Sequence, residues 1–137
     1  MDTTLFSCSS AEETAYAMQE CGALIRRGEL VAFPTETVYG LGANALDAEA
    51  VARIFRVKNR PADNPLIAHI SGFEMISRVV SAVPEGIEAL TRRFWPGPLT
   101  VVFPRGKEIP AVVSAGLDTV AVRCPSHPIA NQLIRAA

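Results

Sequence analysis

Apolar and polar positions along the chain predict short buried strands that alternate with helices. The strands are four apolar runs rich in β-branched residues, at 30–33, 66–70, 99–103 and 119–123. Helices are expected after capping or proline signals at Ser10 with Glu13, Asp47, Ser71 with Glu74, Pro84, and Ser126 with Pro128. Strands that alternate with helices are typical of an α/β fold whose sheet is covered by helices.

The connection between the last two predicted strands carries no convincing helical pattern. Parallel neighbours usually need a helical crossover, so some antiparallel pairing is expected here. The predicted fold is therefore a mixed parallel/antiparallel sheet flanked by helices. No internal repeat, low-complexity tract or linker divides the chain, so residues 1–137 are expected to form a single domain.

Composition places the chain among globular proteins. Of its 137 residues, 49% are hydrophobic and 20% are charged, which argues against disorder. No apolar run approaches the roughly 18–20 residues that span a bilayer, and the start of the chain lacks a secretory pattern. The three cysteines, Cys8, Cys21 and Cys124, show no metal-like spacing, so we expect reduced thiols in a cytoplasmic protein without a membrane anchor.

Charge is unevenly distributed along the chain, although the net charge is −1. Residues 1–52 carry two basic and eight acidic side chains, whereas residues 53–137 carry eleven basic and six acidic ones. Four of the cations lie between positions 53 and 60. A local positive site on a nearly neutral protein favours a small anionic ligand over a long polyanion such as nucleic acid.

The loop after the first predicted strand, residues 34–42 with the sequence PTETVYGLG, is the first candidate site. It lies at the carboxyl end of a strand and leads into a helix, which is where ligands bind in open α/β sheets. It carries hydroxyls, one carboxylate and two glycines that let a ligand approach the backbone. A tight polar loop around a packed Tyr39 is an alternative of even weight. The overlapping segment 40–45, GLGANA, matches a relaxed dinucleotide fingerprint too far from the strand, so we discount it.

A second candidate site combines Lys58 and Arg60, which lie where a helix gives way to a proline-bounded loop. Both cations can converge on one polyphosphate, Arg with a planar fork and Lys as a point charge. The alternative is that Arg53, Arg56 and Lys58 form a solvated helix face whose cations offset the negative helix end. Asn64 in the loop and His69 in the following strand favour the site, although a histidine in an apolar strand is usually structural.

Arg123 closes the last predicted strand and is the third candidate. A cation in this place can clamp a carboxylate ligand, and it can equally form a salt bridge with a nearby acid. Histidines and carboxylates show no metal-ligand spacing, so no metal site is expected. No serine or cysteine lies in a nucleophile elbow, so the expected chemistry joins one ligand to another without a covalent enzyme intermediate.

Several segments together resemble the threonylcarbamoyl-AMP synthase family, the YrdC-like domain, from about residue 11 onward. They are 34–42 (PTETVYGLG), 58–60 (KNR) with 64–66 (NPL), 94–100 (FWPGPLT) and 120–125 (VAVRCP). Motifs in this order are far more specific than any one of them. The resemblance implies a YrdC-like twisted mixed sheet flanked by helices.

The resemblance implies an L-threonylcarbamoyladenylate synthase, a nucleotidyltransferase that makes threonylcarbamoyl-AMP and pyrophosphate from L-threonine, bicarbonate and ATP with Mg²⁺. The product would feed the threonylcarbamoyladenosine modification of tRNA through a downstream threonylcarbamoyl transferase. Catalysis would rest on positioning and charge neutralisation. The implied residue roles are catalysis by Lys58 and Arg60, ATP contacts from Lys58, Arg60, Asn64 and Thr119, and threonine contacts from Thr37, His69 and Arg123.

The chain departs from the family toward its C-terminal end. The family pairs the K-x-R motif with a later S-x-N motif, and no Ser-x-Asn follows Arg123 here. The last predicted helix also lacks a stop signal, a pattern that fits an incomplete domain and equally a frayed terminal helix. We expect the single YrdC-like domain at 1–137 to be incomplete at this end, and the chain alone to bind ATP weakly and turn over poorly.

Two other functions compete with this interpretation. YrdC-like domains also occur in hydrogenase-maturation carbamoyltransferases, but those are large chains with zinc-finger-like cysteine motifs, and this sequence has none. A non-catalytic RNA-binding module would use the cationic concave surface of the fold. The net charge of −1 and the lack of aromatic stacking motifs speak against such a module, while a contact with tRNA or another RNA stays open.

Overall fold

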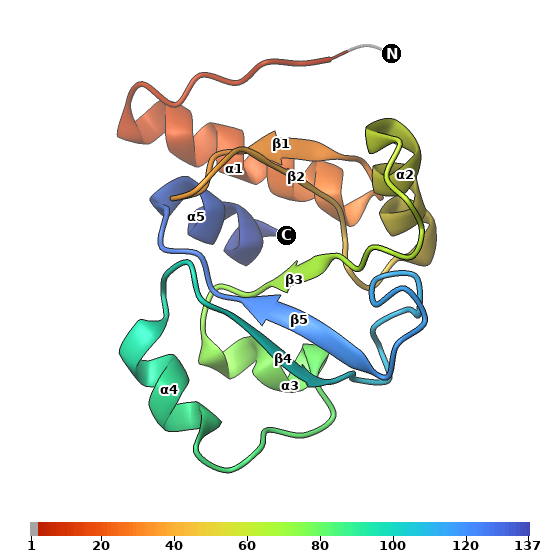
Figure 1. The fold of residues 1–137 in the computed structure, drawn as a ribbon. Coiled ribbons are helices and arrows are strands. Elements are labelled where there is room, and N and C mark those ends of the chain that lie inside the picture. The colour runs from red at the N-terminus through yellow and green to blue at the C-terminus, as the bar shows by residue number, and fades with distance from the viewer. Residues whose placement is uncertain (1–2) are drawn as a thin grey trace.

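The computed structural model describes residues 3–137, and Figure 1 shows their arrangement. The helices are α1 (Ala11–Arg26), α2 (Ala48–Lys58), the 3₁₀ turn η1 (Phe73–Met75), α3 (Ile76–Val79), α4 (Ile87–Phe94) and α5 (Pro128–Ala136). The strands are β1 (Val31–Phe33), β2 (Gly40–Gly42), β3 (Ile67–His69), β4 (Thr100–Pro104) and β5 (Thr119–Arg123). None of the helices within residues 3–137 combines the length and the apolar character that crossing a membrane requires.

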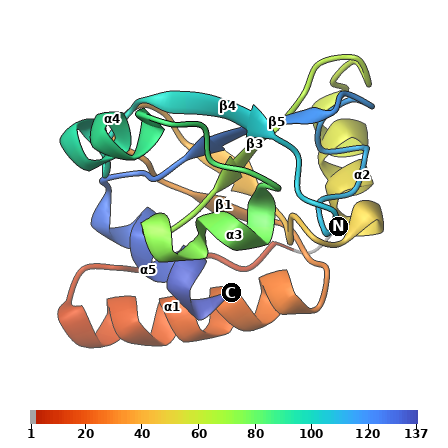
Figure 2. The same cartoon turned by 90° about the horizontal axis from the view of Figure 1, so that it is seen from below.

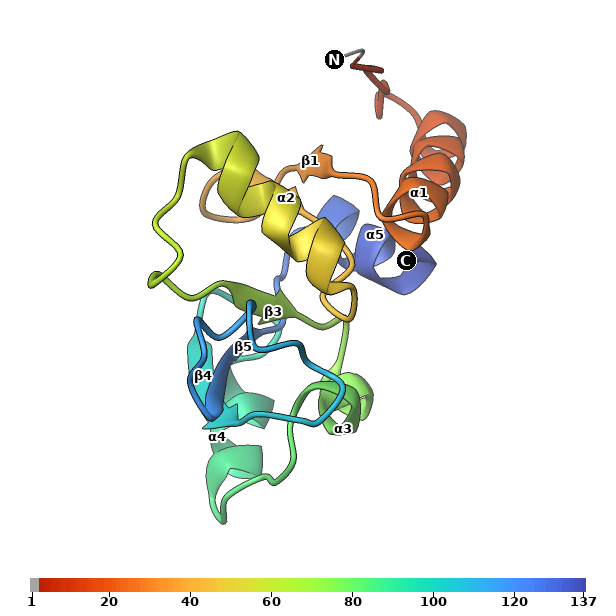
Figure 3. The same cartoon turned by 90° about the vertical axis from the view of Figure 1, so that its right-hand side faces the viewer.

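A three-stranded sheet in the order β3-β5-β4 lies in the middle of the molecule (Figures 1 and 3). β3 runs parallel to β5, and β4 runs antiparallel to it, so the expected mixed sheet is confirmed. The segment between β4 and β5 forms turns, which lets these two strands pair antiparallel. The pairing places His69 of β3 beside Arg123 of β5.

Residues 40–42 form strand β2, which pairs antiparallel with β1 in a separate two-stranded sheet. The prediction that these residues belong to a loop leading into a helix is wrong. Phe33 lies opposite Gly40 in the register, and its ring is so close that a Cβ at Gly42 would lie 2.8 Å from ring atom Cε1. The glycines therefore make room for an aromatic ring, and the segment is a strand rather than a dinucleotide-binding turn.

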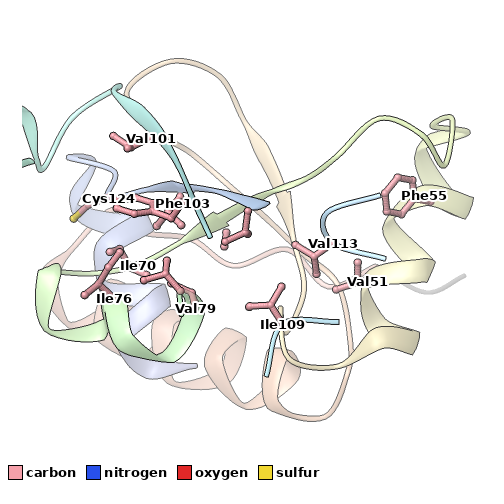
Figure 4. Packing of buried hydrophobic residues seen from close by; sticks show 14 residues of the cluster. Val51, Phe55, Ile70, Ile76, Val79, Val101, Phe103, Ile109, Val113 and Cys124 are labelled. Atoms are coloured by element: carbon pink, nitrogen blue, oxygen red, sulfur yellow. The ribbon is translucent and has the colours of Figure 1, made fainter. Parts of the chain in front are cut away.

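Two hydrophobic clusters hold the elements together. The larger one packs the three-stranded sheet against α2, α3 and the 105–118 segment, with Phe103 and Ile70 fully buried (Figure 4). The smaller one lies between α1, β1 and α5, and the two helices lie side by side (Figure 2). A Cβ at Gly22 of α1 would come within 2.5 Å of the Ala136 carbonyl oxygen, so glycine permits this close approach.

Two helix starts follow the predicted caps. The Ser10 hydroxyl accepts a hydrogen bond from the backbone N–H of Glu13 at 3.1 Å. A carboxylate oxygen of Asp47 accepts the N–H groups of Glu49 and Ala50 at 2.9 and 3.2 Å. Each cap satisfies backbone donors that the first helical turn leaves without a partner. Local chemistry therefore sets where α1 and α2 begin.

The third predicted helix is shorter than expected and starts differently. It consists of η1 followed by the single turn α3, and the residue before η1 is Gly72 in an extended conformation. The predicted Ser71–Glu74 capping pair is wrong. The residue at the cap position is Gly72, which has no side chain to cap the turn, and the Ser71 hydroxyl donates to the Met75 sulfur at 3.0 Å.

The last two helices also differ from the prediction at their starts. α4 begins at Ile87 instead of Pro84, because residues 85 and 86 form a turn just before the helix. The final helix is capped by His127, whose Nδ1 accepts the backbone N–H of Ile129 at 3.3 Å. Ser126, the expected start signal, lies one residue earlier, and its backbone N–H donates to a carboxylate oxygen of Glu36.

The Phe103→Ala variant tests the larger cluster. Phe103 is fully buried, so truncating it leaves a cavity and should lower the free energy of unfolding by about 3–5 kcal/mol. Val102→Ala is the matched control, because the neighbouring Val102 is 62% exposed and should change that free energy by less than about 1 kcal/mol. Urea unfolding followed by circular dichroism measures both. Equal losses in the two variants would contradict this packing.

Candidate functional site

A cavity of about 620 Å³ lies at the junction of the two hydrophobic clusters. Its wall is formed by the β1–β2 hairpin, α2, β3, and parts of α3 and α5. The cavity brings together side chains from segments that are far apart in the sequence. Six of the seven residues singled out by the family resemblance line it: Thr37, Lys58, Arg60, Asn64, His69 and Arg123.

Arg123 at the end of β5 is held on three sides and is only 8% exposed. Its Nε donates to the carbonyl oxygen of Gly97 at 3.3 Å. One terminal nitrogen donates to the Thr37 hydroxyl at 3.4 Å, and the other forms an ion pair with Glu36. The alternative of a salt bridge with a nearby acid is therefore confirmed. Each terminal nitrogen of a guanidinium carries a second N–H, which remains for a ligand.

Glu36 ties its loop to two other segments. One carboxylate oxygen pairs with Arg123, and the other accepts the backbone N–H groups of Ser126 and His127 at 3.1 and 3.2 Å. Burial disfavours the charged carboxylate, but the hydrogen bonds, led by that of Arg123, outweigh it and lower the pKa of Glu36 from the ordinary 4.5 to about 2. The carboxylate is therefore ionised at neutral pH, and it holds the loop to β5 and to the start of α5.

The hydroxyls of this loop divide into one that shapes the loop and one that contacts the guanidinium. The Thr35 hydroxyl accepts the backbone N–H groups of Thr37 and Val38, each at 3.2 Å, which closes a tight turn. The turn presents the Thr37 hydroxyl to the guanidinium. The alternative of a packed Tyr39 is wrong, because this residue is 78% exposed.

His69 ends β3 beside Arg123. Its Nδ1 lies 3.1 Å from the carbonyl oxygen of Ile67, and because a carbonyl only accepts, this hydrogen bond assigns the ring proton to Nδ1 and leaves Nε2 as an acceptor. The Phe33 ring meets the imidazole edge-on, with ring centroids 6.2 Å apart. Burial lowers the pKa of His69, and the charge of Arg123 acts in the same direction. A neutral imidazole therefore lies beside the guanidinium.

The cationic part of the cavity lies at the other end of β3. Lys58 is the last residue of α2, and Asn59 follows with a left-handed φ of 46°, which turns the chain out of the helix. Arg60 donates to the backbone and side-chain oxygens of Asn64 at 3.0 and 2.7 Å and to the Pro65 carbonyl at 2.8 Å. The loop before β3 therefore closes around one guanidinium.

Lys58 and Arg60 differ from the two arginines that precede them. Those two form ion pairs on the helix surface, Arg53 with Glu29 at 2.7 Å and Arg56 with Glu49 at 2.8 Å. No carboxylate within residues 3–137 lies within ion-pair distance of Lys58 or Arg60. The solvated-face alternative therefore describes Arg53 and Arg56, and it stays open for Lys58, which is exposed at the end of α2. No described carboxylate neutralises Lys58 or Arg60, so their charges remain available to an anion in the cavity.

Thr119 is the one predicted site residue outside the cavity wall. It starts β5 opposite Pro104 and is exposed, so its assignment as an ATP contact stays a prediction. Conversely, Arg78 of α3 lines the cavity although no motif marks it, because a lone arginine on a short helix carries no signal. The Gly97 carbonyl and the N–H groups before α5 could not be predicted as contacts either. Every residue has a backbone carbonyl, and every residue except proline has an N–H, so these groups leave no pattern in the sequence.

Replacing Glu36 with Gln should change how stability depends on pH. Because the folded pKa of about 2 lies below the ordinary 4.5, the ionised carboxylate stabilises the fold above pH 4.5, and this stabilisation is lost as the pH falls toward 2. At neutral pH the Glu36→Gln variant should be less stable by on the order of 2 kcal/mol, and the difference should vanish near pH 2. Urea unfolding at a series of pH values measures it.

Glu49→Gln is the control for this experiment, because it removes a carboxylate from an exposed ion pair with Arg56. Its stability should follow that of the unaltered protein across the pH range. A Glu36→Gln deficit that stays constant from neutral to acid pH would contradict the assignment of the low pKa.

Comparison with known proteins places this geometry in a family. A family model for the Sua5/YciO/YrdC domain, described as Telomere recombination, matches residues 23–137. The chain is 63% identical over 110 residues to a threonylcarbamoyl-AMP synthase of Pyrococcus abyssi, covering 80% of this chain and 32% of the relative. It is 50% identical over 117 residues to the threonylcarbamoyl-AMP synthase of Bacillus subtilis, covering 85% and 34%.

A crystal structure of Pyrococcus abyssi Sua5 complexed with L-threonine has the same fold, with a TM-score of 0.87 and 56% identity. The match covers 89% of this chain and 36% of that one. The chain spans about a third of the length of these relatives. On the family-model match and these identities, the chain belongs to the Sua5/YciO/YrdC family.

Proposed function

We propose that this chain carries substrate-binding residues of an L-threonylcarbamoyladenylate synthase, which joins L-threonine, bicarbonate and ATP into threonylcarbamoyl-AMP and releases pyrophosphate. The observation that carries the proposal is a single cavity lined by the firmly held Arg123 and by the cations Lys58 and Arg60. The relatives named threonylcarbamoyl-AMP synthase, and the Sua5 structure complexed with L-threonine, support it.

In this proposal the amino acid binds at the end of the cavity formed by His69 and Arg123. Its carboxylate accepts the terminal N–H groups of Arg123 that the protein leaves unused, beside the Thr37 hydroxyl. Neutral His69 offers Nε2 to the amino group. Bicarbonate takes up the proton that the ammonium group loses and dehydrates to carbon dioxide and water. The neutral amine then adds to the carbon of carbon dioxide and loses a proton, which gives the carbamate of the amino acid.

The triphosphate binds at the Lys58 and Arg60 end, with Asn64 and Thr119 as further ATP contacts. ATP enters as its magnesium complex. Within residues 3–137, no three or more His, Cys, Asp and Glu side chains lie close enough together to hold a metal ion. A carbamate oxygen attacks the α-phosphorus, and pyrophosphate leaves. Lys58 and Arg60 offset the charge on the leaving group, so catalysis rests on positioning and electrostatics.

The adenylate then passes to a threonylcarbamoyl transferase that modifies tRNA. We place this reaction in the cytoplasm, where thiols stay reduced, and the three free cysteines fit that compartment. Recognition of RNA belongs to the later transfer step, because the synthesis itself needs only small substrates.

Pyrophosphate release that requires both L-threonine and bicarbonate tests the proposed reaction. Because the chain alone is expected to bind ATP weakly and turn over poorly, the protein with MgATP should form threonylcarbamoyl-AMP slowly, and mass spectrometry identifies the product by its mass. L-serine is the matched substrate control and should give less product. Pyrophosphate release that does not respond to L-threonine would contradict the proposal.

Two variants should separate the two ends of the cavity. Arg60→Ala should weaken MgATP binding roughly ten- to hundredfold, because a charge-assisted hydrogen bond contributes about 1.5–3 kcal/mol, and should leave L-threonine binding unchanged. Arg123→Lys keeps a positive charge opposite Glu36 but loses the planar fork, so it should weaken L-threonine by a similar factor and leave MgATP unchanged. Isothermal titration calorimetry measures both ligands.

Arg56→Ala is the matched control, because Arg56 lies on α2 near Lys58 but pairs with Glu49 at the surface. This variant should bind both ligands like the unaltered protein. If Arg60→Ala and Arg56→Ala had the same effect on MgATP, the cationic end would not be a phosphate site.

A further inference from the structure

We propose that Glu36 is a positioning residue of the amino-acid site: it holds the Arg123 guanidinium in the orientation that receives the carboxylate of the substrate. The inference rests on the proposed function, since it concerns the same site. The residue roles that the family resemblance implies do not include Glu36. Its place in the site comes from its contacts.

Glu36 is the point where three segments meet. Its side chain joins the hairpin loop to Arg123 of β5 and to the backbone N–H groups of Ser126 and His127, just before α5. The Glu36 side chain is 19% exposed and that of Arg123 is 10% exposed, so both partners are largely removed from water. An interaction in this setting is screened less than a surface ion pair.

Arg123 needs this partner because its charge is buried. The Gly97 carbonyl and the Thr37 hydroxyl each accept one hydrogen bond, but both are neutral. Without Glu36 the guanidinium would be a buried charge without a counterion, which is unfavourable and drives the side chain out of its position. A mobile arginine must then be ordered again when a ligand binds, and that ordering weakens binding.

Only a carboxylate satisfies all the donors that surround this position. One oxygen faces Arg123 while the other faces the N–H groups of Ser126 and His127, so both oxygens must accept. A glutamine is nearly the same size but has one accepting oxygen and an NH₂ group that would face donors. Glu36→Gln therefore removes the positioning contact with a minimal change in volume.

The test compares two ligands that differ only at the carboxylate. L-Threonine and L-threoninamide are titrated by calorimetry into the unaltered protein, Glu36→Gln, Glu36→Asp and the surface control Glu49→Gln. The unaltered protein and Glu49→Gln should prefer L-threonine over the amide. In Glu36→Gln the affinity for L-threonine should fall about tenfold while that for the amide changes little, so the preference collapses. Glu36→Asp keeps the charge with a shorter reach and should lie between.

The outcomes separate the inference from the function on which it rests. Failure of the unaltered protein to bind L-threonine would overturn the proposed function and the inference with it. Binding of L-threonine that is unchanged or tighter in Glu36→Gln would overturn the inference alone, since tighter binding means that Glu36 competes with the substrate for Arg123. Equal weakening of both ligands would also overturn it, because a purely structural role acts on both. Should Glu36→Gln fail to fold, Glu36→Asp with an undiminished preference for L-threonine would overturn it.

Discussion

The ion pair between Glu36 and Arg123 joins the two parts of the molecule that surround the cavity. Glu36 belongs to the hairpin loop next to the smaller hydrophobic cluster, and Arg123 belongs to the sheet next to the larger one. A buried pair adds little net stability, because both charges lose their hydration, but removing one partner is costly because the other stays buried. The pair therefore acts mainly by fixing position: hairpin, sheet and α5 meet at one carboxylate, and this sets the shape of the cavity between them.

The two ends of the cavity differ in charge, and β3 sets the distance between them. Arg60 binds a carbonyl just before β3, and His69 ends the same strand beside Arg123. At about 3.3 Å per strand residue, the two ends lie on the order of 10 Å apart. The pair of Arg123 with Glu36 is neutral as a whole and suits a zwitterion, whereas Lys58 and Arg60, which no described carboxylate neutralises, suit a polyanion. In the proposed function, the paired end of the cavity would receive the amino acid and the cationic end the triphosphate.

The parts of the structure that depend on local chemistry could be predicted from the sequence. β3, β4 and β5 lie on the β-branched runs, and α1 and α2 begin at the predicted caps. β2 could not be predicted, because a Gly-Leu-Gly segment has little strand propensity and pairs where Phe33 covers it. In the site, the end of a strand marked Arg123 as a candidate. Its partner lies 87 residues earlier in the chain, and no local pattern links a loop carboxylate to a distant strand end.

Three of the segments that carry the family resemblance converge on the Arg123 guanidinium, although they are far apart in the sequence. Segment 34–42 supplies Glu36 and the Thr37 hydroxyl, segment 94–100 supplies the Gly97 carbonyl, and segment 120–125 supplies the arginine itself. The Gly97 N–H donates in turn to the Cys124 carbonyl at 2.8 Å, which fixes the position of Gly97. A side chain would not fit here, because a Cβ would lie 2.5 Å from the Phe94 carbonyl oxygen. Each of the three guanidinium nitrogens therefore has an acceptor, two of them from segment 34–42 and one from segment 94–100. A change in any of them acts on the same group, so the three motifs are parts of one arginine site rather than separate sites.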